Sequence, residues 1–375
     1  MPKLLPILVP LLLLGVIAIA AQDLPQGANE LERSAGELLQ KEMKERFISG
    51  ASVAVSRRGR VVFTKGFGWA NIESSIAAGV DTRYQIGSTT KPFTAVAILM
   101  LVEDRRVGLD DPVSKYLPNL PTVYGGITIR QLLTHTSGIN RDLRTGNTDD
   151  FTIDDFWKRL ATAPVSFEPG KRWEYSNTGY IVLGLVIEAV TKRSFGDFVT
   201  DRIFRPLRMK DTSYLEPFSK GRNRAVGYDW IENSFRPSPY FSGGYAAGGL
   251  VSTVADLAKW DAALNTEKLL KRGSLQQMWK PAKLADGKQV SFDFRGRPTS
   301  YGLGWFLTER GGRPVAFHGG TVSGFSSQIT RFSDSQLTVI AITNTKSGPD
   351  RFGHAEILVE RLGGIYSPGT GAKEQ

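Results

Sequence analysis

The hydrophobic and polar positions of the chain predict strands towards both ends and helices between them. Apolar runs at 52–56 and 61–67 flank an Arg-Gly turn and predict a hairpin. Two further β-rich runs, 326–332 and 337–344, are separated by four polar residues and predict a second antiparallel hairpin. The sequence therefore predicts an α+β fold whose sheet joins the two ends of the chain.

Helical patterns occupy the other segments. Residues 31–47 form a polar-rich amphipathic pattern, and residues 356–362 also have helical spacing. Between about 109 and 264 the pattern is mostly helical, with loops marked by Gly and Pro. One more segment is apolar nearly all round, which predicts a buried helix. Its apolar residues are Phe93, Val96, Ala97, Met100 and Leu101.

The N-terminus has the pattern of an export signal. Lys3 is the only charged residue before Asp23, and the apolar run between them closes on the tripeptide Ala-Ile-Ala at 18–20. We therefore expect a signal peptide over 1–21 and a periplasmic or extracellular protein. The alternative is a retained membrane anchor, because an apolar run of about 18 residues is close to the length of a transmembrane span.

After this segment we expect a single domain over 22–365 and a flexible Gly/Pro tail over 366–375. The composition then narrows the chemistry of that domain. The chain of 375 residues has no cysteine, which excludes disulfides, thiolate metal sites and a lipid anchor on cysteine. With three histidines and no His-Glu-x-x-His motif, we expect no metal. The net charge is +10, but the basic residues are spread along the chain and cluster only in a predicted turn at 57–60. We therefore expect no nucleic-acid partner.

The first candidate motif is Ser88-Thr89-Thr90-Lys91, directly before the predicted buried helix. A serine nucleophile needs a base, and residues three apart share a helix face, so Lys91 can reach the Ser88 hydroxyl. The helix N-terminus and burial both disfavour a protonated lysine, which could then act as the base. Composition alone predicts about 1.4 such matches by chance. A capping serine followed by a solvated lysine is therefore the alternative.

Two further motifs follow along the chain. Tyr175-Ser176-Asn177 lies on a predicted loop that enters a helix, where a phenol could relay protons and an amide could bond substrate or lysine. The alternative is that Asn177 only caps the helix. His318-Gly319-Gly320-Thr321 precedes the closing hairpin, and paired glycines on a strand allow a ligand backbone to approach. The alternative there is a tight turn with a surface histidine.

The order and spacing of these motifs resemble the serine β-lactamase and penicillin-binding protein superfamily. The closer resemblance is to its branch of class C β-lactamases, DD-peptidases, D-aminopeptidases and esterases. Three other stretches strengthen it: 132–138, 248–257 and 301–305. The resemblance spans about 35–362. It implies a β-lactamase/transpeptidase-like fold, in which an antiparallel sheet is flanked by helices and the middle of the chain, about 109–264, is mostly helical.

The resemblance also implies roles for the motif residues. Ser88 is the acylated nucleophile, Lys91 and Tyr175 form the general acid/base pair, and Asn177 hydrogen-bonds Lys91 and substrate. The backbone N–H groups of Ser88 and Thr321 form the oxyanion hole, the latter following His318, Gly319 and Gly320. No metal or organic cofactor is implied. We expect His135 to make structural hydrogen bonds instead of taking part in the chemistry.

One departure from the family pattern bears on the substrate. Typical β-lactamases carry Lys-Thr-Gly or Lys-Ser-Gly at the third motif, and that lysine can bind a substrate carboxylate. His318 is mostly neutral at pH 7. We therefore expect an exported serine hydrolase that acts on a D-amino-acid peptide, amide or ester, with weak or absent β-lactam hydrolysis. Its substrate would be a small molecule or a short peptide, such as one derived from the cell wall.

Two other functions stay open at this point. The first is a true class C-like β-lactamase. The second is a non-catalytic envelope binding protein on the same fold, whose basic charge would attract an anionic polymer.

Overall fold

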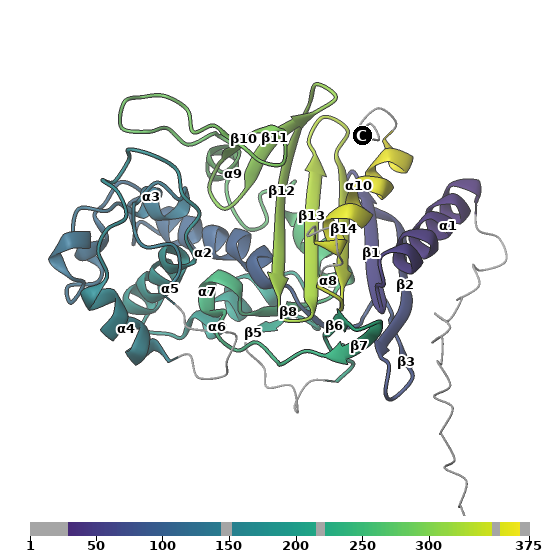
Figure 1. Cartoon of the computed structure of the whole chain (residues 1–375). Helices are drawn as coiled ribbons and strands as arrows, with labels where there is room; N and C mark the ends of the chain where they lie inside the picture. The colour runs from purple at the N-terminus through teal and green to yellow at the C-terminus, as the bar shows by residue number, and fades with distance from the viewer. Residues whose placement is uncertain (1–28, 144–151, 215–221, 347–352, 368–375) are drawn as a thin grey trace, which may run out of the picture.

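A nine-stranded antiparallel sheet forms the body of the computed structural model, which describes residues 29–143, 152–214, 222–346 and 353–367. The strand order is β3-β2-β1-β14-β13-β12-β11-β10-β9, so strands from the two chain ends meet inside the sheet at the β1–β14 pair (Figure 1). The strands are β1 (Gly50–Arg57), β2 (Arg60–Asn71), β3 (Ile76–Ala77), β9 (Phe292–Asp293), β10 (Pro298–Tyr301), β11 (Phe306–Arg310), β12 (Arg313–Val322), β13 (Phe325–Phe332) and β14 (Leu337–Thr343). The expected α+β class is confirmed.

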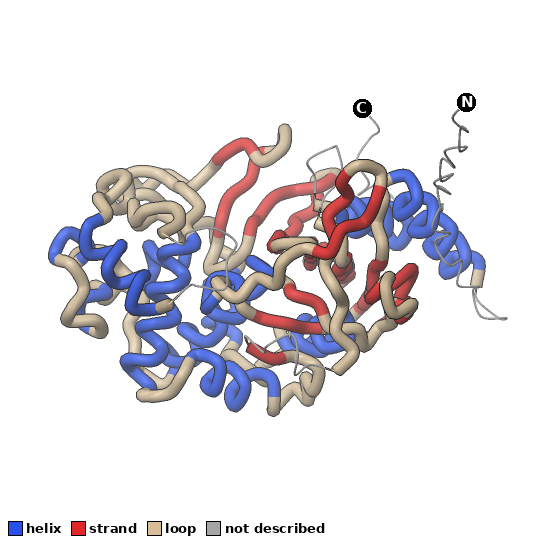
Figure 2. The backbone as a smooth tube through the Cα atoms, turned by 60° about the horizontal axis from the view of Figure 1, so that its bottom comes forward, coloured by secondary structure: helices blue, strands red, loops and turns tan. Residues whose placement is uncertain are grey.

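Helices cover both faces of this sheet. Figure 2 shows the helices of the middle of the chain gathered at one end of the molecule, beside the strands. The helices are α1 (Glu30–Glu45), α2 (Lys91–Glu103), α3 (Ile129–Leu133), α4 (Ile153–Thr162), α5 (Asn177–Thr191), α6 (Phe195–Val199), α7 (Tyr245–Gly248), α8 (Val254–Ala263), α9 (Arg272–Met278) and α10 (His354–Tyr366). In the part of the chain that the structure describes, none of them has the length and hydrophobicity needed to cross a bilayer.

The alternation of side chains along each strand separates two hydrophobic cores. Val53 and Val55 of β1 pack with α1 and α10, whereas Ala54 between them packs with the cluster that contains α2 and α5. The central strands β13 and β14 are buried along their whole length, because both of their faces are covered. This explains why these strands appear in the sequence as nearly continuous apolar runs.

Both predicted hairpins are present. β1 pairs with β2 up to Arg57↔Arg60, and β13 pairs with β14 up to Phe332↔Leu337. The three strands at one end of the sheet, β9, β10 and β11, were not predicted. They have only 2, 4 and 5 residues and carry few apolar positions, so no period could be read from them.

The middle of the chain is helical as expected, and it also contributes short strands. Residues 109–264 contain α3 to α8, and they also supply strands to two small sheets, ordered β4-β8-β5 and β6-β7. The strands of these two sheets are β4 (Tyr84–Gln85), which lies before residue 109, and β5 (Ser213–Tyr214), β6 (Tyr228–Ile231), β7 (Ser234–Pro237) and β8 (Leu250–Ser252). They are two to four residues long, which is too short for a hydrophobic pattern to identify.

The C-terminal helix is longer than predicted. We expected a helix over 356–362 and a tail from 366, whereas α10 continues to Tyr366. Tyr366 is 5% exposed, and its ring centroid lies 6.1 Å from that of Phe63 on β2, so packing against the sheet extends the helix. The rest of the expected tail, from 368, and the expected signal peptide over 1–21 lie outside the described residues.

Asn344 holds the junction between the two chain ends. We expected it to be the last residue of the closing strand, but β14 ends at Thr343 and the Asn344 side chain is fully buried. Its amide nitrogen donates to the carbonyl oxygens of Trp69 (3.0 Å), Ala70 (3.2 Å) and Val226 (2.9 Å), and its oxygen accepts from the Ser49 hydroxyl at 2.8 Å. One side chain therefore satisfies polar groups from three separate segments.

Replacing this amide should be costly. Asn344→Leu keeps the approximate volume but removes the side-chain N–H donors of the Trp69, Ala70 and Val226 carbonyl oxygens, of which Ala70 keeps the Val226 N–H, so we expect the free energy of unfolding to fall by about 3 kcal/mol. The same amide-to-alkyl change at exposed Gln289 should stay within about 0.5 kcal/mol. Urea denaturation of both variants measures the difference. Equal stabilities would show that Asn344 does not hold the junction.

Candidate active site

Ser88 lies at the turn that connects the sheet of β4 to the buried helix α2. Residues Gly87–Thr90 form a short 3-10 turn that leads directly into α2. Gly87 has φ +49°, a conformation that favours glycine, and Pro92 stands in the first turn of α2, where its missing N–H has no cost. This local chemistry presents Ser88 at the N-terminal end of a helix that is itself held by the core.

Lys91 connects Ser88 to the rest of the site. Its side chain is fully buried, and its Nζ lies 3.0 Å from Ser88 Oγ, 2.7 Å from Asn177 Oδ1 and 2.8 Å from the Ala247 carbonyl oxygen. The alternative of a solvated lysine is therefore wrong. The amide and carbonyl oxygens can only accept, so they fix two N–H groups and aim the third position of the amine at the Ser88 hydroxyl. In the neutral amine, that position is a lone pair able to accept the serine proton.

Asn177 is oriented by a carboxylate that the sequence did not reveal. Ser176, not Asn177, is the N-cap of α5, because the Ser176 hydroxyl accepts from the Gly179 N–H. The Asn177 side chain instead donates from Nδ2 to Asp142 Oδ2 at 2.7 Å, which turns its Oδ1 towards Lys91. The capping alternative is therefore wrong.

Sequence reasoning missed two members of this network. Asp142 is not part of any recognisable motif, and its contact with Asn177 depends on the conformation of the loop that contains it. Ala247 contributes only its carbonyl oxygen, which carries no residue-type signal. That carbonyl is held in place because the Thr94 hydroxyl of α2 donates to the neighbouring Ala246 carbonyl at 2.6 Å.

The ring of Tyr175 lies beside the amine of Lys91. Lys91 Nζ is 4.7 Å from the centroid of the Tyr175 ring, and the ring stacks parallel to that of Phe306. His135 supports the loop from behind: its Nδ1 accepts from the Ser176 N–H at 3.1 Å. Burial lowers the pKa of His135 well below its usual value, so this nitrogen stays able to accept. His135 has the structural role that we expected, and the acid/base role of Tyr175 stays a prediction.

Gly320 allows β12 to approach the Ser88 turn. A Cβ at position 320 would lie 2.0 Å from the Ile86 carbonyl oxygen and 2.8 Å from Ser88 N. A Cβ at Gly87 would likewise lie 3.1 Å from Thr321 N. The backbones of these two segments are therefore in direct contact, which brings the Ser88 and Thr321 amides to the same place. This is the proximity that an oxyanion hole needs.

The strand edge at this point is open. β11 pairs with β12 only as far as Phe306↔Phe317, so no β11 pairing extends to the stretch from His318 to Val322. Gly319 lies on this stretch, and a side chain there would meet Gln328 Oε1 at 2.4 Å. The open edge lies next to Ser88, where an extended substrate could lie along it.

His318 is a buried neutral group. Its Nδ1 lies 2.8 Å from the Gly319 carbonyl oxygen and must donate to it, so Nε2, 3.1 Å from the Tyr301 hydroxyl, accepts from that hydroxyl. Burial, and secondly the positive charge of a protonated Lys91, lower the pKa of His318 to about 3. The alternative of a surface histidine is wrong, since the residue is 1% exposed.

These residues share one cavity of about 500 Å³. Its lining includes the expected Ser88, Tyr175, His318, Gly319, Gly320 and Thr321, while Lys91 and Asn177 reach the site through their bonds to each other and to Ser88. The lining also has an aromatic wall and four charged side chains that the sequence analysis did not place. They are Trp173, Phe292, Phe294, Phe306 and Phe317, with Arg141, Asp293, Arg295 and Glu356.

Comparison with known proteins agrees with this geometry. A family model described as Beta-lactamase matches residues 36–362. Protein flp of Staphylococcus aureus (strain MW2) is 30% identical over 329 residues, which cover 85% of this chain and 64% of that protein. The chain thus spans less than two thirds of the length of this relative.

Two solved structures share the fold over most of the chain. The octameric penicillin-binding protein homologue from Pyrococcus abyssi has a TM-score of 0.76 and 28% identity, over 89% of this chain and 77% of that one. The D-amino acid amidase from Ochrobactrum anthropi SV3, solved with D-phenylalanine, has a TM-score of 0.78 and 26% identity, over 90% of this chain and 99% of that one.

The close approach at Gly320 can be tested by adding one methyl group. Gly320→Ala should push β12 away from the Ser88 turn and separate the two amides, so we expect kcat to fall by about 100-fold or more. Gly273→Ala is the matched control, because a Cβ there meets no atom within 4 Å. Steady-state kinetics on a p-nitrophenyl ester provides the measurement. Full activity of Gly320→Ala would disprove the proposed position of the oxyanion hole.

The neutral state of His318 should appear in the pH dependence of stability. Between pH 6.5 and about 3 the unfolded chain binds a proton at this site that the folded chain does not bind. The free energy of unfolding should therefore fall as the pH is lowered through this window, by up to about 1.4 kcal/mol per pH unit from this residue. His318→Gln should lose that share of the slope in denaturant titrations from pH 7 to pH 4. Parallel curves for the two proteins would contradict the assignment.

Proposed function

The chain belongs to the beta-lactamase family of serine hydrolases, and we propose that it cleaves an amide or ester bond through an acyl-enzyme on Ser88. One observation carries the proposal. The buried Lys91 amine lies 3.0 Å from the Ser88 hydroxyl, and its other two directions are taken by acceptors. Lys91 is therefore placed to act as the base that accepts the hydroxyl proton of Ser88.

In the proposed cycle, Ser88 Oγ attacks the substrate carbonyl while its proton passes to Lys91, with Tyr175 as the partner in proton transfer. The carbonyl oxygen becomes negative and accepts from the N–H groups of Ser88 and Thr321, each worth about 3 kcal/mol in such sites. The proton then goes to the leaving amine or alcohol as the tetrahedral intermediate collapses to the acyl-enzyme. Water repeats the sequence and releases the acid.

For the substrate, we propose a D-amino-acid amide, peptide or ester. The solved structure of a D-amino acid amidase is similar over nearly its whole length, which supports a substrate of this kind. The neutral His318 supports weak or absent β-lactam hydrolysis, because it offers no fixed cation to a carboxylate beside the reacting carbonyl. Fragments of the cell wall are within this substrate class.

We further propose that the protein is exported, and that it then works in the periplasm or outside the cell. The support is the expected signal peptide over 1–21, in which Lys3 precedes an apolar run that ends in small residues. N-terminal sequencing of the protein purified from its host would test this. A start at Met1 would instead favour the retained anchor.

A substrate panel separates the proposed activity from its alternatives. The panel contains p-nitrophenyl acetate, D-Ala-p-nitroanilide, a D-Ala-D-Ala peptide and nitrocefin. We expect turnover of D-amino-acid amides or esters, with nitrocefin at least about 100-fold slower in kcat/KM. Faster hydrolysis of nitrocefin than of all the others would favour a true β-lactamase.

Two variants test the catalytic roles directly. Ser88→Ala should abolish turnover, and Lys91→Ala should lower kcat by about 1000-fold with little change in KM, because the lysine acts in the transition state. If no substrate in the panel gives turnover that depends on Ser88, a non-catalytic binding protein becomes the better description.

A further inference from the structure

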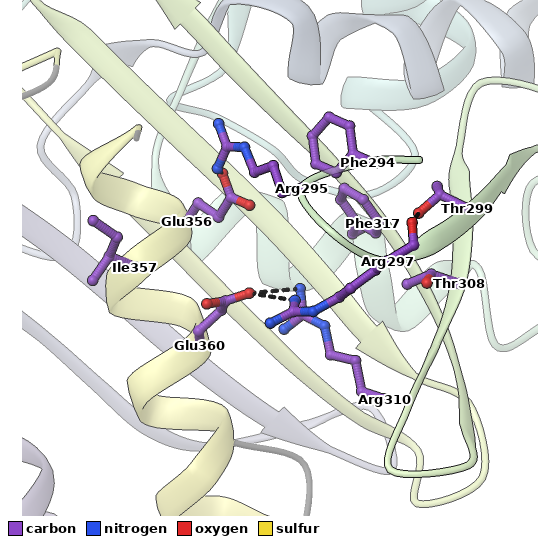
Figure 3. A pocket seen from close by; sticks show the side chains of 10 residues that line it. All are labelled: Phe294, Arg295, Arg297, Thr299, Thr308, Arg310, Phe317, Glu356, Ile357 and Glu360. Atoms are coloured by element: carbon purple, nitrogen blue, oxygen red, sulfur yellow. Dashed lines mark hydrogen bonds and ion pairs between the residues drawn. The ribbon is translucent and has the colours of Figure 1, made fainter. Parts of the chain in front are cut away.

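A second pocket, of about 180 Å³, lies between α10 and the strands β10, β11 and β12 with the loop after β9. Figure 3 shows its lining, in which side chains from the strands and loop face side chains from the helix. The lining residues with charge are Arg295, Arg297 and Arg310 from the strands and their loop, and Glu356 and Glu360 from α10. Three positive and two negative groups leave a net charge of +1, so the pocket favours an anion.

Arg310 is the least compensated of these charges. It is 7% exposed, and its Nη2 lies 3.3 Å from Glu360 Oε1. The same oxygen also accepts from Arg297 Nη1 at 2.8 Å, so one carboxylate is shared by two guanidinium groups. Arg310 Nε is buried and has no hydrogen-bond partner among the described residues.

A buried cation with an unpaired N–H is costly unless an oxygen ligand completes it. Burial lowers the pKa of Arg310, which is the sign of this cost. The planar guanidinium fork matches a carboxylate, which can accept two N–H groups at once. Arg297 remains paired to Glu360 nearby, so an incoming carboxylate could bind Arg310 without leaving Glu360 unpaired.

The pocket adjoins the catalytic cavity. Four residues line both recesses: Phe294, Arg295, Phe317 and Glu356. Phe317 stands four residues before Thr321 on β12, a separation of about 13 Å along a strand. The stretch of β12 between them is the edge that β11 leaves open. A chain lying along this edge from Ser88 would reach the pocket after roughly three to four extended residues.

We propose that the pocket of Arg295, Arg297 and Arg310 is a subsite for a carboxylate at the far end of the substrate. The substrate class is then an amide or ester whose acyl or leaving chain carries an anionic group three to four residues from the bond that is cleaved. This inference rests on the proposed function and adds the charge and length of the substrate. It also adds positive charge further along the sheet from His318 than Arg141 and Arg295, which line the catalytic cavity itself.

Matched substrates test the subsite on either side of the bond. On the leaving side the pair is D-Ala-Gly-Gly-Gly with a free C-terminal carboxylate and the same peptide as its C-terminal amide. On the acyl side the pair is succinyl-Gly-Gly-D-Ala-p-nitroanilide and its succinamoyl counterpart. We expect the anionic member of one pair to be preferred by about tenfold or more in kcat/KM.

Arg310→Gln should reduce that preference to less than about twofold. Arg313→Gln is the matched control: it removes the same charge directly opposite Arg310 in the β11–β12 hairpin, where Arg313 pairs with Asp334 and does not line the pocket. It should retain the full preference. Arg297→Gln is the second pocket variant if Arg310→Gln does not fold, since the Arg297 side chain is 35% exposed. It should also weaken the preference.

Calorimetric binding to Ser88→Ala separates failure of the subsite from failure of catalysis. The anionic peptide should bind at least about tenfold more tightly than its amide, and Arg310→Gln on the Ser88→Ala background should remove the difference. Turnover that depends on Ser88, together with no charge preference in either pair, would overturn the subsite and leave the proposed function standing. A preference that survives both pocket variants would also overturn it. If the anionic peptide binds more tightly than its amide but no substrate is turned over, the subsite is supported and the proposed function is contradicted.

Discussion

The site depends on one buried nitrogen, the Nζ of Lys91. A side chain with no exposed surface must find all of its partners inside the protein, and those of this amine include Ser88 Oγ, Asn177 Oδ1 and the Ala247 carbonyl oxygen. These partners come from the turn before α2, from the first residue of α5 and from α7. Satisfying the amine therefore also holds three segments of the helical region together, so stability and the geometry of the proposed nucleophile, Ser88, have the same origin.

The contact between this region and the sheet supplies the second half of the site. Ser88 comes with α2, whereas Thr321 comes with β12, and the two amides meet only because neither Gly87 nor Gly320 carries a side chain. Both glycines are needed for a close approach of two backbones, and Gly87 also has a positive φ. Small shifts of β12 relative to α2 would therefore affect catalysis before they affected either core.

The sequence predicts those parts whose signal is local. The Ser88–Lys91 spacing, the loop position of Tyr175 and the two hairpins could be read because a helix turn or a strand pair connects near neighbours. Asp142 and Ala247 could not, since Asp142 acts from a loop 35 residues before Asn177 and Ala247 acts through its backbone 156 residues after Lys91. Asn344 was assigned to a strand because it follows an apolar run, and only its three carbonyl partners from distant segments explain why the strand stops before it.

The position of positive charge determines which substrates such a site can prefer. A lysine at the third motif would place a cation beside the reacting carbonyl, where the carboxylate of a compact bicyclic substrate lies. His318 is held neutral by burial and donates its only proton to the Gly319 carbonyl, so that position is closed to an anion. The catalytic cavity itself has Arg141 and Arg295 in its lining, and the proposed subsite adds Arg297 and Arg310 beyond Phe317. A carboxylate would reach Arg297 and Arg310 on a chain that follows the open β12 edge, so the proposed subsite and the neutral His318 both favour, under the proposed function, an extended substrate over a compact β-lactam.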